Sequence, residues 1–437
     1  MNELRQNITN VSNEKLPNDD NIGRRIENQL LDFNIKENNI FVGDNLKVMQ
    51  DINFYNKYKG KVSFIYIDPP YNTQVNFSYS DRRTSIAWGE FMNERIQASY
   101  SFLNDRGCIF ISIDDSELAN LKTLCDSIFG KENFIGSFIT KQSQRSNARL
   151  INTIHEYIIC YAKDISKVQP FKISRTEIAE DYEMINKLYM EVTNKLNSEG
   201  YSSADKLLKE LVKKYCYDYG ITWLNNYNNL SKDGKIFFAK DLSTPGKPRT
   251  VDIPEINLHL EPLKSRGWSS DKRFIELYHN NRLSFKAGRP YLIQYLEESE
   301  DNAPSILNFY SRFGTNDLKK LGLDGLFDTP KPVDMIKYFI RLVTKKDDIV
   351  MDYFAGSGTT GQAVLEVNEE LKMNLKCVLI QLNENVHPNT EVYKKCLELK
   401  LQPNVVEILK FRLNTFCQKN KIVNSFKEIT FKEINCE

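Results

Sequence analysis

The chain has 437 residues, of which 41% are hydrophobic and 27% are charged, as in a globular protein with about two or three structural units. Its formal net charge of +1 does not by itself indicate a nucleic-acid partner. It has no run of about 18 apolar residues and no apolar signal segment at its start, so we expect a cytoplasmic protein without a membrane partner.

Eight cysteines are scattered along the sequence without any C-x-x-C pair, and the chain has four histidines. The spacing that a zinc site requires is therefore missing. We expect the cysteines to be reduced packing residues and predict no metal-binding site.

The first elements predict an α/β fold. Residues 1–36 are polar and are expected to form a helical or loosely held N-terminal arm. In residues 37–164, strand and helix patterns alternate, which is typical of a doubly wound, mainly parallel, Rossmann-like sheet. The predicted strands are 40–42, 62–67, 108–113, 134–139 and 157–162. The predicted helices are 46–55, 86–103 and a third that Asp115 caps and that ends at Phe129.

This alternation stops at about residue 165. A Lys/Glu-rich stretch, 178–217, is expected to be helical, and the segment after it has too many aromatic rings for a disordered linker. Residues 165–325 are therefore predicted to be an inserted domain, with most of its aromatic side chains in its own core.

The α/β pattern returns in residues 326–392, which predict the second half of the sheet domain. A helix from Pro332 to Val343 is followed by a strand around Ile349, a helix over 360–371 and a strand over 376–382. Residues 393–437 are expected to form a helical C-terminal tail that packs on the domain or supports a dimer.

Two stretches, 141–149 and 280–290, each carry three basic residues and no acidic one. They could neutralise phosphate groups of a nucleic acid, although ordinary solvated loops have the same composition.

The first motif of interest, Asp68-Pro69-Pro70-Tyr71, directly follows the predicted strand 62–67, at the end where open α/β sheets hold their ligands. It suits chemistry on the exocyclic amine of a base, whose lone pair is delocalised into the ring. The Asp68 carboxylate and the Pro69 carbonyl would accept its two hydrogens, and the Tyr71 ring would stack on the base. The fixed φ of proline holds that carbonyl in place. A rigid turn without chemistry is the alternative.

A second motif, Phe354-Ala355-Gly356-Ser357-Gly358-Thr359-Thr360, follows the strand around Ile349 and opens a helix. With Gly361 it satisfies G-x-G-x-x-G, so a nicotinamide-dependent oxidoreductase is a rival interpretation. Asp352 and Phe354 place an acid and an aromatic ring at this turn. They suit a cofactor with an ammonium group and an adenine ring better than a pyrophosphate.

Together the two motifs resemble those of DNA amino-methyltransferases, in the permuted (beta) order in which the catalytic motif precedes the cofactor motif. The resemblance implies S-adenosylmethionine as the cofactor and a flipped-out base as the substrate. An aspartate at the first position, here Asp68, is typical of the enzymes that act on adenine N6. Transfer to cytosine N4 remains an alternative, as does a binding protein that keeps the fold without turnover.

The resemblance also implies a set of cofactor-binding residues. Asp44, in a strand-ending Gly-Asp-Asn motif, would lie beside the cofactor, although it equally fits a helix N-cap. The segment 329–332 would contact the methionine part of the donor. Gln381 or Glu384 would bind the ribose hydroxyls, and the choice between them stays open. The full set is Asp44, Asp68, Thr329, Lys331, Pro332, Asp352, Phe354, Ala355, Gly356, Ser357, Gly358, Thr359, Gln381 and Glu384.

The similarity extends over residues 38–385 and is greatest to the modification subunits of type III restriction-modification systems. Matching stretches include Tyr66-Ile67-Asp68-Pro69-Pro70-Tyr71 and Phe327-Asp328-Thr329-Pro330-Lys331-Pro332. The resemblance implies site-specific methylation of double-stranded DNA, with target recognition by the insert. It also implies a homodimer and leaves open a partnership with a helicase-like restriction subunit.

Overall fold

The computed structural model describes residues 33–73, 84–141, 150–175, 179–423 and 426–431. The expected N-terminal arm, 1–36, and the basic stretch 141–149 lie almost entirely outside these residues. The chain divides into two compact units, one formed by residues 1–171 and 304–437 and the other by residues 172–303.

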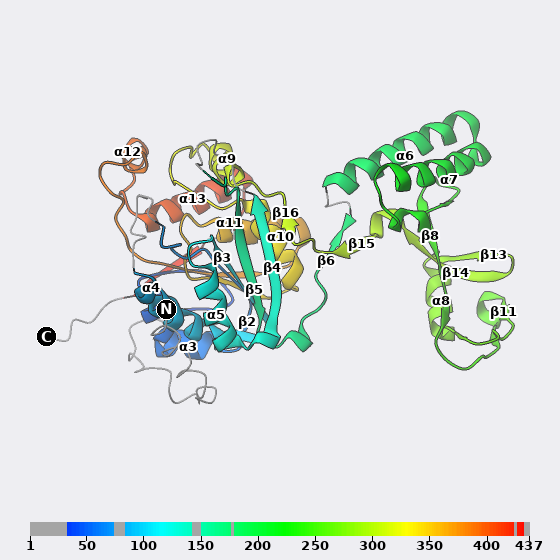
Figure 1. Cartoon of the computed structure of the whole chain (residues 1–437), viewed down its shortest axis with the longest axis horizontal. Coiled ribbons are helices and arrows are strands. Elements are labelled where there is room, and N and C mark those ends of the chain that lie inside the picture. Colours follow the sequence, from blue (N-terminus) through cyan, green and yellow to red (C-terminus); the bar gives the residue numbers. More distant parts are fainter. Residues whose placement is uncertain (1–32, 74–83, 142–149, 176–178, 424–425, 432–437) are drawn as a thin grey trace. The chain divides into compact units, whose positions relative to one another are not determined.

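The first unit is built on a nine-stranded sheet with the order β16-β4-β5-β3-β2-β17-β18-β1-β19. Its strands are β1 (Asn38–Val42), β2 (Val62–Ile67), β3 (Leu103–Ile113), β4 (Phe134–Lys141), β5 (His155–Ala162), β16 (Ile306–Leu307), β17 (Ile349–Asp352), β18 (Lys376–Gln381) and β19 (Phe426–Thr430). Figure 1 shows β3, β5 and β4 side by side. Neighbouring strands are parallel except that β5 is antiparallel to β3 and β4, which confirms the mainly parallel sheet.

The first half of this unit contains the helices α2 (Asn45–Gln50), α3 (Ile52–Tyr58), α4 (Ser85–Tyr100) and α5 (Leu118–Phe129). Two predictions were wrong here. The helix predicted over 46–55 is broken because the Asp51 side chain accepts hydrogen bonds from Asn53 N and Phe54 N and so starts α3. Asp115 does not cap α5, since the N-cap position is Glu117, whose side chain makes no cap bond.

The second half contains α9 (Arg312–Leu321), α10 (Val333–Val343), α11 (Thr359–Leu371), α12 (Glu391–Glu398) and α13 (Val405–Asn420). The tail predicted to be helical is only partly so, because β19 adds to the edge of the sheet parallel to β1. Burial of Ile429 and Phe431 favours the strand over a solvated helix.

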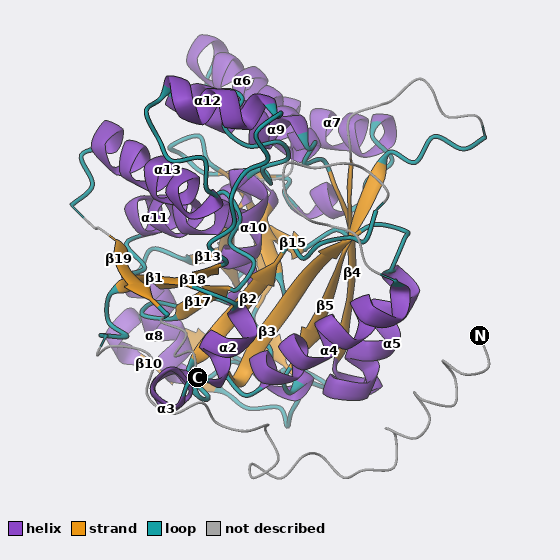
Figure 2. Ribbon diagram, turned by 90° about the vertical axis from the view of Figure 1, so that its left-hand side faces the viewer, coloured by secondary structure: helices purple, strands orange, loops and turns teal. Residues whose placement is uncertain are grey.

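Helices cover both faces of the sheet. Ile65 and Ile67 of β2 belong to the same core cluster as Trp88 of α4. Phe110 of β3 packs edge-on against Phe339 of α10, with ring centroids 5.2 Å apart. Figure 2 shows α4 and α5 on one face of the sheet and α11 and α13 on the other. Strands buried on both faces read as continuous apolar runs, which is why β2 was predicted at its observed bounds.

The second unit spans 172–303, whereas the insert was predicted over 165–325. The last predicted residues belong to the first unit, because β16 pairs with β4 and Leu318 of α9 joins a core cluster with Phe416 of α13. At the other boundary, Phe171 packs against Phe110 with centroids 5.9 Å apart. These contacts bury apolar surface in the first unit and so move both boundaries inward.

The second unit contains the helices α6 (Ala179–Glu199), α7 (Tyr201–Asp218) and α8 (Asp271–His279). Its largest sheet consists of β7 (Asn229–Leu230), β8 (Ile236–Asp241), β13 (Leu283–Lys286) and β14 (Arg289–Tyr295), in the order β13-β14-β8-β7. The unit also contains three separate two-stranded sheets. They pair β6 (Lys172–Ser174) with β15 (Glu300–Asn302), β9 (Ser243–Thr244) with β12 (Gly267–Trp268), and β10 (Val251–Ile253) with β11 (Leu258–Leu260).

The helical stretch predicted over 178–217 is two helices, because Gly200 adopts φ +84°, where other residues are strained. Trp268 and Phe274 lie in one of the unit's core clusters, in agreement with the expected aromatic core. In the basic stretch 280–290, Arg282 pairs with Glu298 and Arg289 with Asp241, so much of its charge is compensated locally. Within the described ranges, no helix has the length and hydropathy needed to cross a membrane.

Candidate active site

The two motifs lie at the same edge of the sheet. Strands β2 and β17 are parallel neighbours in which Ile65 pairs with Met351, so the segments after both strands leave the sheet side by side. Tyr71 of the first motif and Phe354 of the second pack against the same core cluster. The structure therefore brings together the two segments that the sequence analysis singled out.

Asp68 follows β2, and its side chain is 28% exposed. The Tyr71 hydroxyl donates to Asp68 Oδ1 over 2.9 Å, and Lys331 Nζ lies 3.2 Å from the same oxygen. Lys331 also donates to the Tyr71 hydroxyl oxygen over 2.7 Å. Both contacts of the carboxylate use Oδ1. Within the described part of the chain, Oδ2 has no hydrogen-bond partner and can accept one from a ligand.

Glu156, at the start of β5, completes this cluster, and the sequence analysis missed it. Its Oε2 accepts a hydrogen bond from Lys331 Nζ at 2.7 Å and lies 3.3 Å from the Tyr71 hydroxyl oxygen, whose one proton is shared with Asp68. A carboxylate in an otherwise apolar strand was the signal that could have found it.

Burial and neighbouring charges shift the pKa values of Asp68, Tyr71 and Lys331. Burial raises the pKa of Asp68; the Lys331 ammonium opposes this rise, and the Glu156 charge adds to it. Burial alone would lower the pKa of Lys331, but the Asp68 and Glu156 carboxylates together raise it above its ordinary value. Lys331 therefore stays charged and compensates two carboxylates.

The turn after Asp68 is fixed by hydrogen bonds. The indole N–H of Trp88, a fully buried residue of α4, donates to the Pro70 carbonyl over 2.6 Å. Asn72 takes up a left-handed conformation with φ +61°, and its side chain donates to Glu117 Oε1 over 2.7 Å. These contacts hold the backbone carbonyls of the turn in one orientation.

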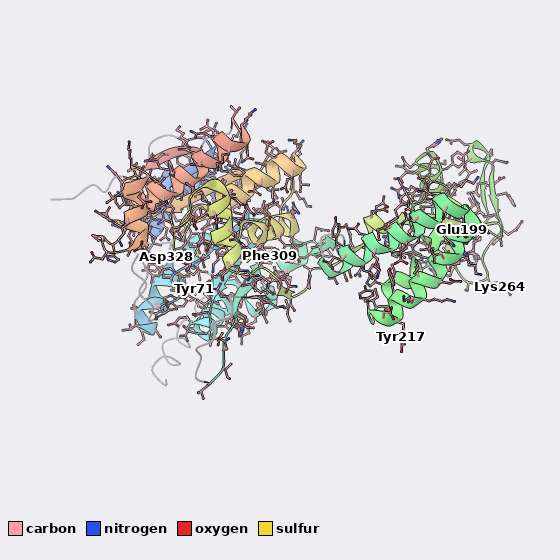
Figure 3. The ribbon with its side chains drawn as sticks, turned by 90° about the horizontal axis from the view of Figure 1, so that it is seen from above. Tyr71, Glu199, Tyr217, Lys264, Phe309 and Asp328 are labelled. Carbon is pink, nitrogen blue, oxygen red and sulfur yellow. The ribbon has the colours of Figure 1, made fainter. Side chains whose placement is uncertain are left out.

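Lys331 reaches Asp68 because the segment before α10 is held on α9. Asp317 accepts a hydrogen bond from Val333 N over 3.0 Å, and Pro332 occupies the N-cap position of α10. A Cβ on Gly314 would lie 1.8 Å from the Pro330 carbonyl oxygen, so only glycine allows this close approach. Figure 3 labels one residue from each of the two segments that meet here: Tyr71 from the segment after β2 and Asp328 from the segment before α10. Thr329 is exposed on this segment.

The glycine motif forms the turn from β17 into α11. Gly356 and Gly358 have φ +53° and +83°, and a Cβ on Gly358 would come within 3.1 Å of Leu409. The Gly356 N–H donates to Gln381 Oε1 over 2.7 Å, and the Gly358 N–H donates to the Ala355 carbonyl over 2.8 Å. Gln381 therefore supports the turn, while its role at a ribose, like that of half-buried Glu384, stays a prediction.

Asp352 ends β17 beneath this turn and is 3% exposed. Its Oδ2 accepts a hydrogen bond from the Thr360 hydroxyl over 2.5 Å, and its Oδ1 accepts one from Phe354 N over 3.0 Å. Burial is the main reason that the pKa of Asp352 rises to about 7, and the hydrogen bonds from Thr360 and Phe354 limit the rise. A cationic group nearby would favour its ionised form.

Asp44 is the N-cap residue of α2, which confirms one of the two expectations made for it, while its place beside the cofactor stays a prediction. Its side chain caps α2 by accepting a hydrogen bond from Lys47 N over 3.1 Å, and it pairs with Arg95 at 2.9 Å. Arg95 also donates to Asn45 Oδ1, and Asn45 in turn donates to the Tyr353 carbonyl over 2.7 Å. The Gly-Asp-Asn motif is thereby connected to the backbone that leads into the glycine motif.

Arg412 of α13 is a further residue that the sequence analysis missed. It is fully buried and donates from Nη1 to Ser357 Oγ at 2.7 Å and to Thr359 Oγ1 at 2.8 Å. Its Nε donates to Gln362 Oε1 over 2.9 Å. The signal was an arginine on the apolar face of a helix, three residues after Leu409.

The second unit has a separate hollow of about 510 Å³ between α7, the segment before β7 and the hairpin β13–β14. It is lined by both polar and aromatic side chains. The lining residues include Tyr201, Lys209, Lys213, Asn225, Asn228, Phe285 and Lys286.

Comparison with known proteins identifies the family to which the chain belongs. The family model described as DNA methylase matches residues 62–391. The StyLTI Mod subunit of a type III restriction-modification enzyme from Salmonella typhimurium LT2 is 28% identical over 84% of this chain and 55% of its own length. The EcoP15I Mod subunit from Escherichia coli is 27% identical over 87% and 63%. The type II methyltransferase M.KpnI from Klebsiella pneumoniae is 29% identical over 81% and 82%.

The chain thus spans 55% and 63% of the lengths of the two Mod subunits. Among solved structures, a putative DNA modification methylase from Thermus thermophilus, complexed with S-adenosyl-L-methionine, is similar with a TM-score of 0.40. It is 11% identical and aligns over 91% of this chain and 100% of that one.

Proposed function

Because the chain belongs to the DNA methylase family, we propose that it transfers a methyl group from S-adenosylmethionine to the exocyclic N6 amine of adenine in double-stranded DNA. The observation that carries the proposal is that Tyr71 and Lys331 contact only one of the two carboxylate oxygens of Asp68. One carboxylate oxygen is held by Tyr71 and Lys331, while the other is available to a ligand beside the glycine motif. Positioning and charge placement of this kind can account for catalysis of methyl transfer.

The residues around the glycine motif fit the proposed cofactor. Asp352 offers a buried carboxyl group whose ionised form a bound ammonium group would stabilise. Phe354 offers a partly exposed ring, and Ser357 and Thr359 offer hydroxyl groups whose oxygens accept hydrogen bonds from Nη1 of Arg412. When bound, S-adenosylmethionine supplies a methyl group activated by its sulfonium.

The chain's own residues prepare the amine. Asp68 Oδ2 accepts one N6 hydrogen and the Pro69 carbonyl accepts the other, which localises the nitrogen lone pair toward the methyl carbon. Lys331 Nζ lies beyond the hydroxyl end of the Tyr71 ring, 2.7 Å from its oxygen and 5.0 Å from its centroid, so it covers neither face of the ring that would stack on the flipped base. As the new N–C bond forms and the S–C bond breaks, N6 gives up a proton, which Asp68 accepts.

The target and partners are part of the proposal. We assign target recognition to the second unit, whose hollow combines lysine and asparagine side chains with aromatic rings. Association with a restriction subunit is supported by the relatives that are Mod subunits of type III restriction-modification enzymes. Homodimerisation is proposed from the sequence resemblance alone. Sedimentation of the purified chain, alone and with the restriction subunit of a type III system, would test both.

The test of the reaction is transfer of a labelled methyl group from S-adenosylmethionine to DNA. We expect Asp68→Ala to lower the rate at least about 100-fold, because the residue accepts a hydrogen bond in the transition state, while the circular dichroism spectrum stays that of the parent. Asp115→Ala, which removes an exposed carboxylate after β3, is the control. Unchanged transfer by Asp68→Ala would refute the role of Asp68.

Calorimetry separates the two cofactor interpretations. We expect heat of binding with S-adenosylmethionine and none with NADH. The glycine motif favours this outcome, because the N–H groups of Gly356 and Gly358 already have partners within the loop and its flanks. A dinucleotide-binding turn uses such groups to bind the pyrophosphate. Binding of NADH alone would favour the oxidoreductase.

A further inference from the structure

Arg412 is a buried cation without a direct carboxylate partner. Its side chain is fully buried, and no ion pair with it is found within the described residues. Burial lowers its pKa to about 10, and the carboxylates of Asp317 and Glu366 act on it only at longer range. It therefore keeps its charge at neutral pH. A buried charge of this kind is costly unless other groups compensate it.

The hydrogen bonds of Arg412 determine which hydroxyl oxygens of the glycine motif act as acceptors. A guanidinium group has only donors, so Ser357 Oγ and Thr359 Oγ1 both act as acceptors toward Nη1. The protons of both hydroxyl groups must then point elsewhere. The two oxygens are 3.4 Å apart, so at most one proton can be used between them. At least one hydroxyl proton is left for a ligand.

The surroundings favour an anionic ligand at this position. The hydroxyl groups lie at the start of α11, a helix of 13 residues with no acidic residue in its first turn and no side-chain cap. The positive end of the helix dipole therefore adds to the charge of Arg412. An independent observation points the same way, since Nη2 of Arg412 is buried without a hydrogen-bond partner among the described residues.

The size of the anion can also be inferred. The backbone N–H groups of Gly356 and Gly358 donate to Gln381 Oε1 and to the Ala355 carbonyl, so they do not form an open cradle for a phosphate. Two adjacent hydroxyl donors match the two oxygens of a single carboxylate instead.

We propose that Arg412 is a positioning residue that holds the hydroxyl groups of Ser357 and Thr359 as hydrogen-bond donors for the carboxylate of the cofactor's methionine part. Arg412 acts through these two residues. This inference rests on the proposed function, because it assumes S-adenosylmethionine as the ligand.

The test compares S-adenosylmethionine with its decarboxylated analogue, which keeps the sulfonium, the amine and the adenosine. We expect the wild type to bind S-adenosylmethionine about 10- to 100-fold more tightly, as hydrogen bonds to a charged group predict. In Arg412→Met this ratio should fall to within about threefold of one, with affinity for the decarboxylated analogue unchanged. Titration calorimetry measures both ligands without DNA and without turnover.

A purely structural role gives a different result. Phe416→Leu, a buried change on the same helix away from the hydroxyl groups, is the matched control and should keep the wild-type ratio. If Arg412→Met weakens both ligands equally, the inference is wrong. If it fails to fold, Ser357→Ala replaces it and must show the same selective loss. A wild type that binds neither ligand would instead contradict the proposed function itself.

Discussion

Lys331 Nζ lies 3.2 Å from Asp68 Oδ1, and it also contacts Tyr71 and Glu156. The sequence resemblance implied that Lys331 contacts the methionine part of the cofactor. In the structure its contacts are with the catalytic motif, and its contact with the cofactor stays a prediction. The ammonium group thus compensates the carboxylate that is proposed to accept the amine of the base.

Replacing Lys331 by methionine should reduce the rate more than cofactor binding. Without the ammonium group, the adjacent carboxylates of Asp68 and Glu156 repel each other, and one takes up a proton. We expect methyl transfer at pH 7.5 to fall about tenfold or more, with the Kd for S-adenosylmethionine within about threefold of wild type. Lys337→Met is a matched control, since Lys337 is also largely buried between two carboxylates, Glu366 and Glu370. A parallel loss of cofactor affinity in Lys331→Met would place its main role at the cofactor.

Glu156→Gln should shift the pH dependence of methyl transfer. Asp68 must be ionised to accept the amine, and the Glu156 charge raises the pKa of Asp68. Removing that charge lowers the pKa, so the acidic limb of the rate profile should move to lower pH. Rates between pH 5 and 8 measure this, and Glu370→Gln, at the matched lysine cluster, should leave the profile in place. A shift to higher pH, or none, would contradict the coupling between Glu156 and Asp68.

Asp352→Asn should change how stability depends on pH. The pKa of Asp352 rises from 3.8 to about 7 in the folded protein, so the folded carboxyl keeps a proton that the unfolded chain has released. Its contribution to stability is therefore lost as pH rises from about 4 to 7, by up to about 4 kcal/mol for about three pKa units. Asparagine does not titrate.

Urea unfolding at pH 5.5 and 8 measures this effect. The free energy of unfolding of Asp352→Asn, relative to wild type, should be higher at pH 8 than at pH 5.5. Asp347→Asn, at an exposed position, should show no such change. An equal difference at the two pH values would mean that Asp352 titrates normally in the folded protein.

The hollow of the second unit should contribute to DNA binding. Lys213 is exposed on α7, and Lys286 lies across the hollow on β13. If both meet phosphates, Lys213→Ala with Lys286→Ala should weaken binding of duplex DNA and reduce the slope of log K against log salt by about 2. Fluorescence anisotropy at several salt concentrations measures this slope. Lys214→Ala, next to Lys213 but outside the hollow, is the control, and equal slopes for all variants would move the DNA contacts elsewhere.

The sequence predicted the parts of the site that depend on local pattern. The apolar run of β2 fixed both its bounds and the position of Asp68, because a strand buried on two faces leaves a clear signal. The glycine motif was recognisable because its turn requires positive φ at Gly356 and Gly358. Such features depend only on residues that are close together in the sequence.

Contacts between distant segments could not be predicted in the same way. Glu156 and Lys331 meet only because β5 and the segment before α10 reach the same edge of the sheet. Gln381 or Glu384 was expected at a ribose, which stays a prediction. The hydrogen bond from the Gly356 N–H to the Gln381 amide oxygen could not be predicted, because it depends on the register between β17 and β18. The strand β19 was missed because its partner, β1, lies at the other end of the sequence.

We propose that Asp68 and the glycine motif form one site that methylates adenine. The most direct test is to incubate the protein with duplex DNA and S-adenosylmethionine labelled in its methyl group, and then to digest the DNA to nucleosides. We expect the label to appear in N6-methyldeoxyadenosine and to be absent with Asp68→Ala. Label in N4-methyldeoxycytidine, or none from a protein that binds the cofactor, would contradict it.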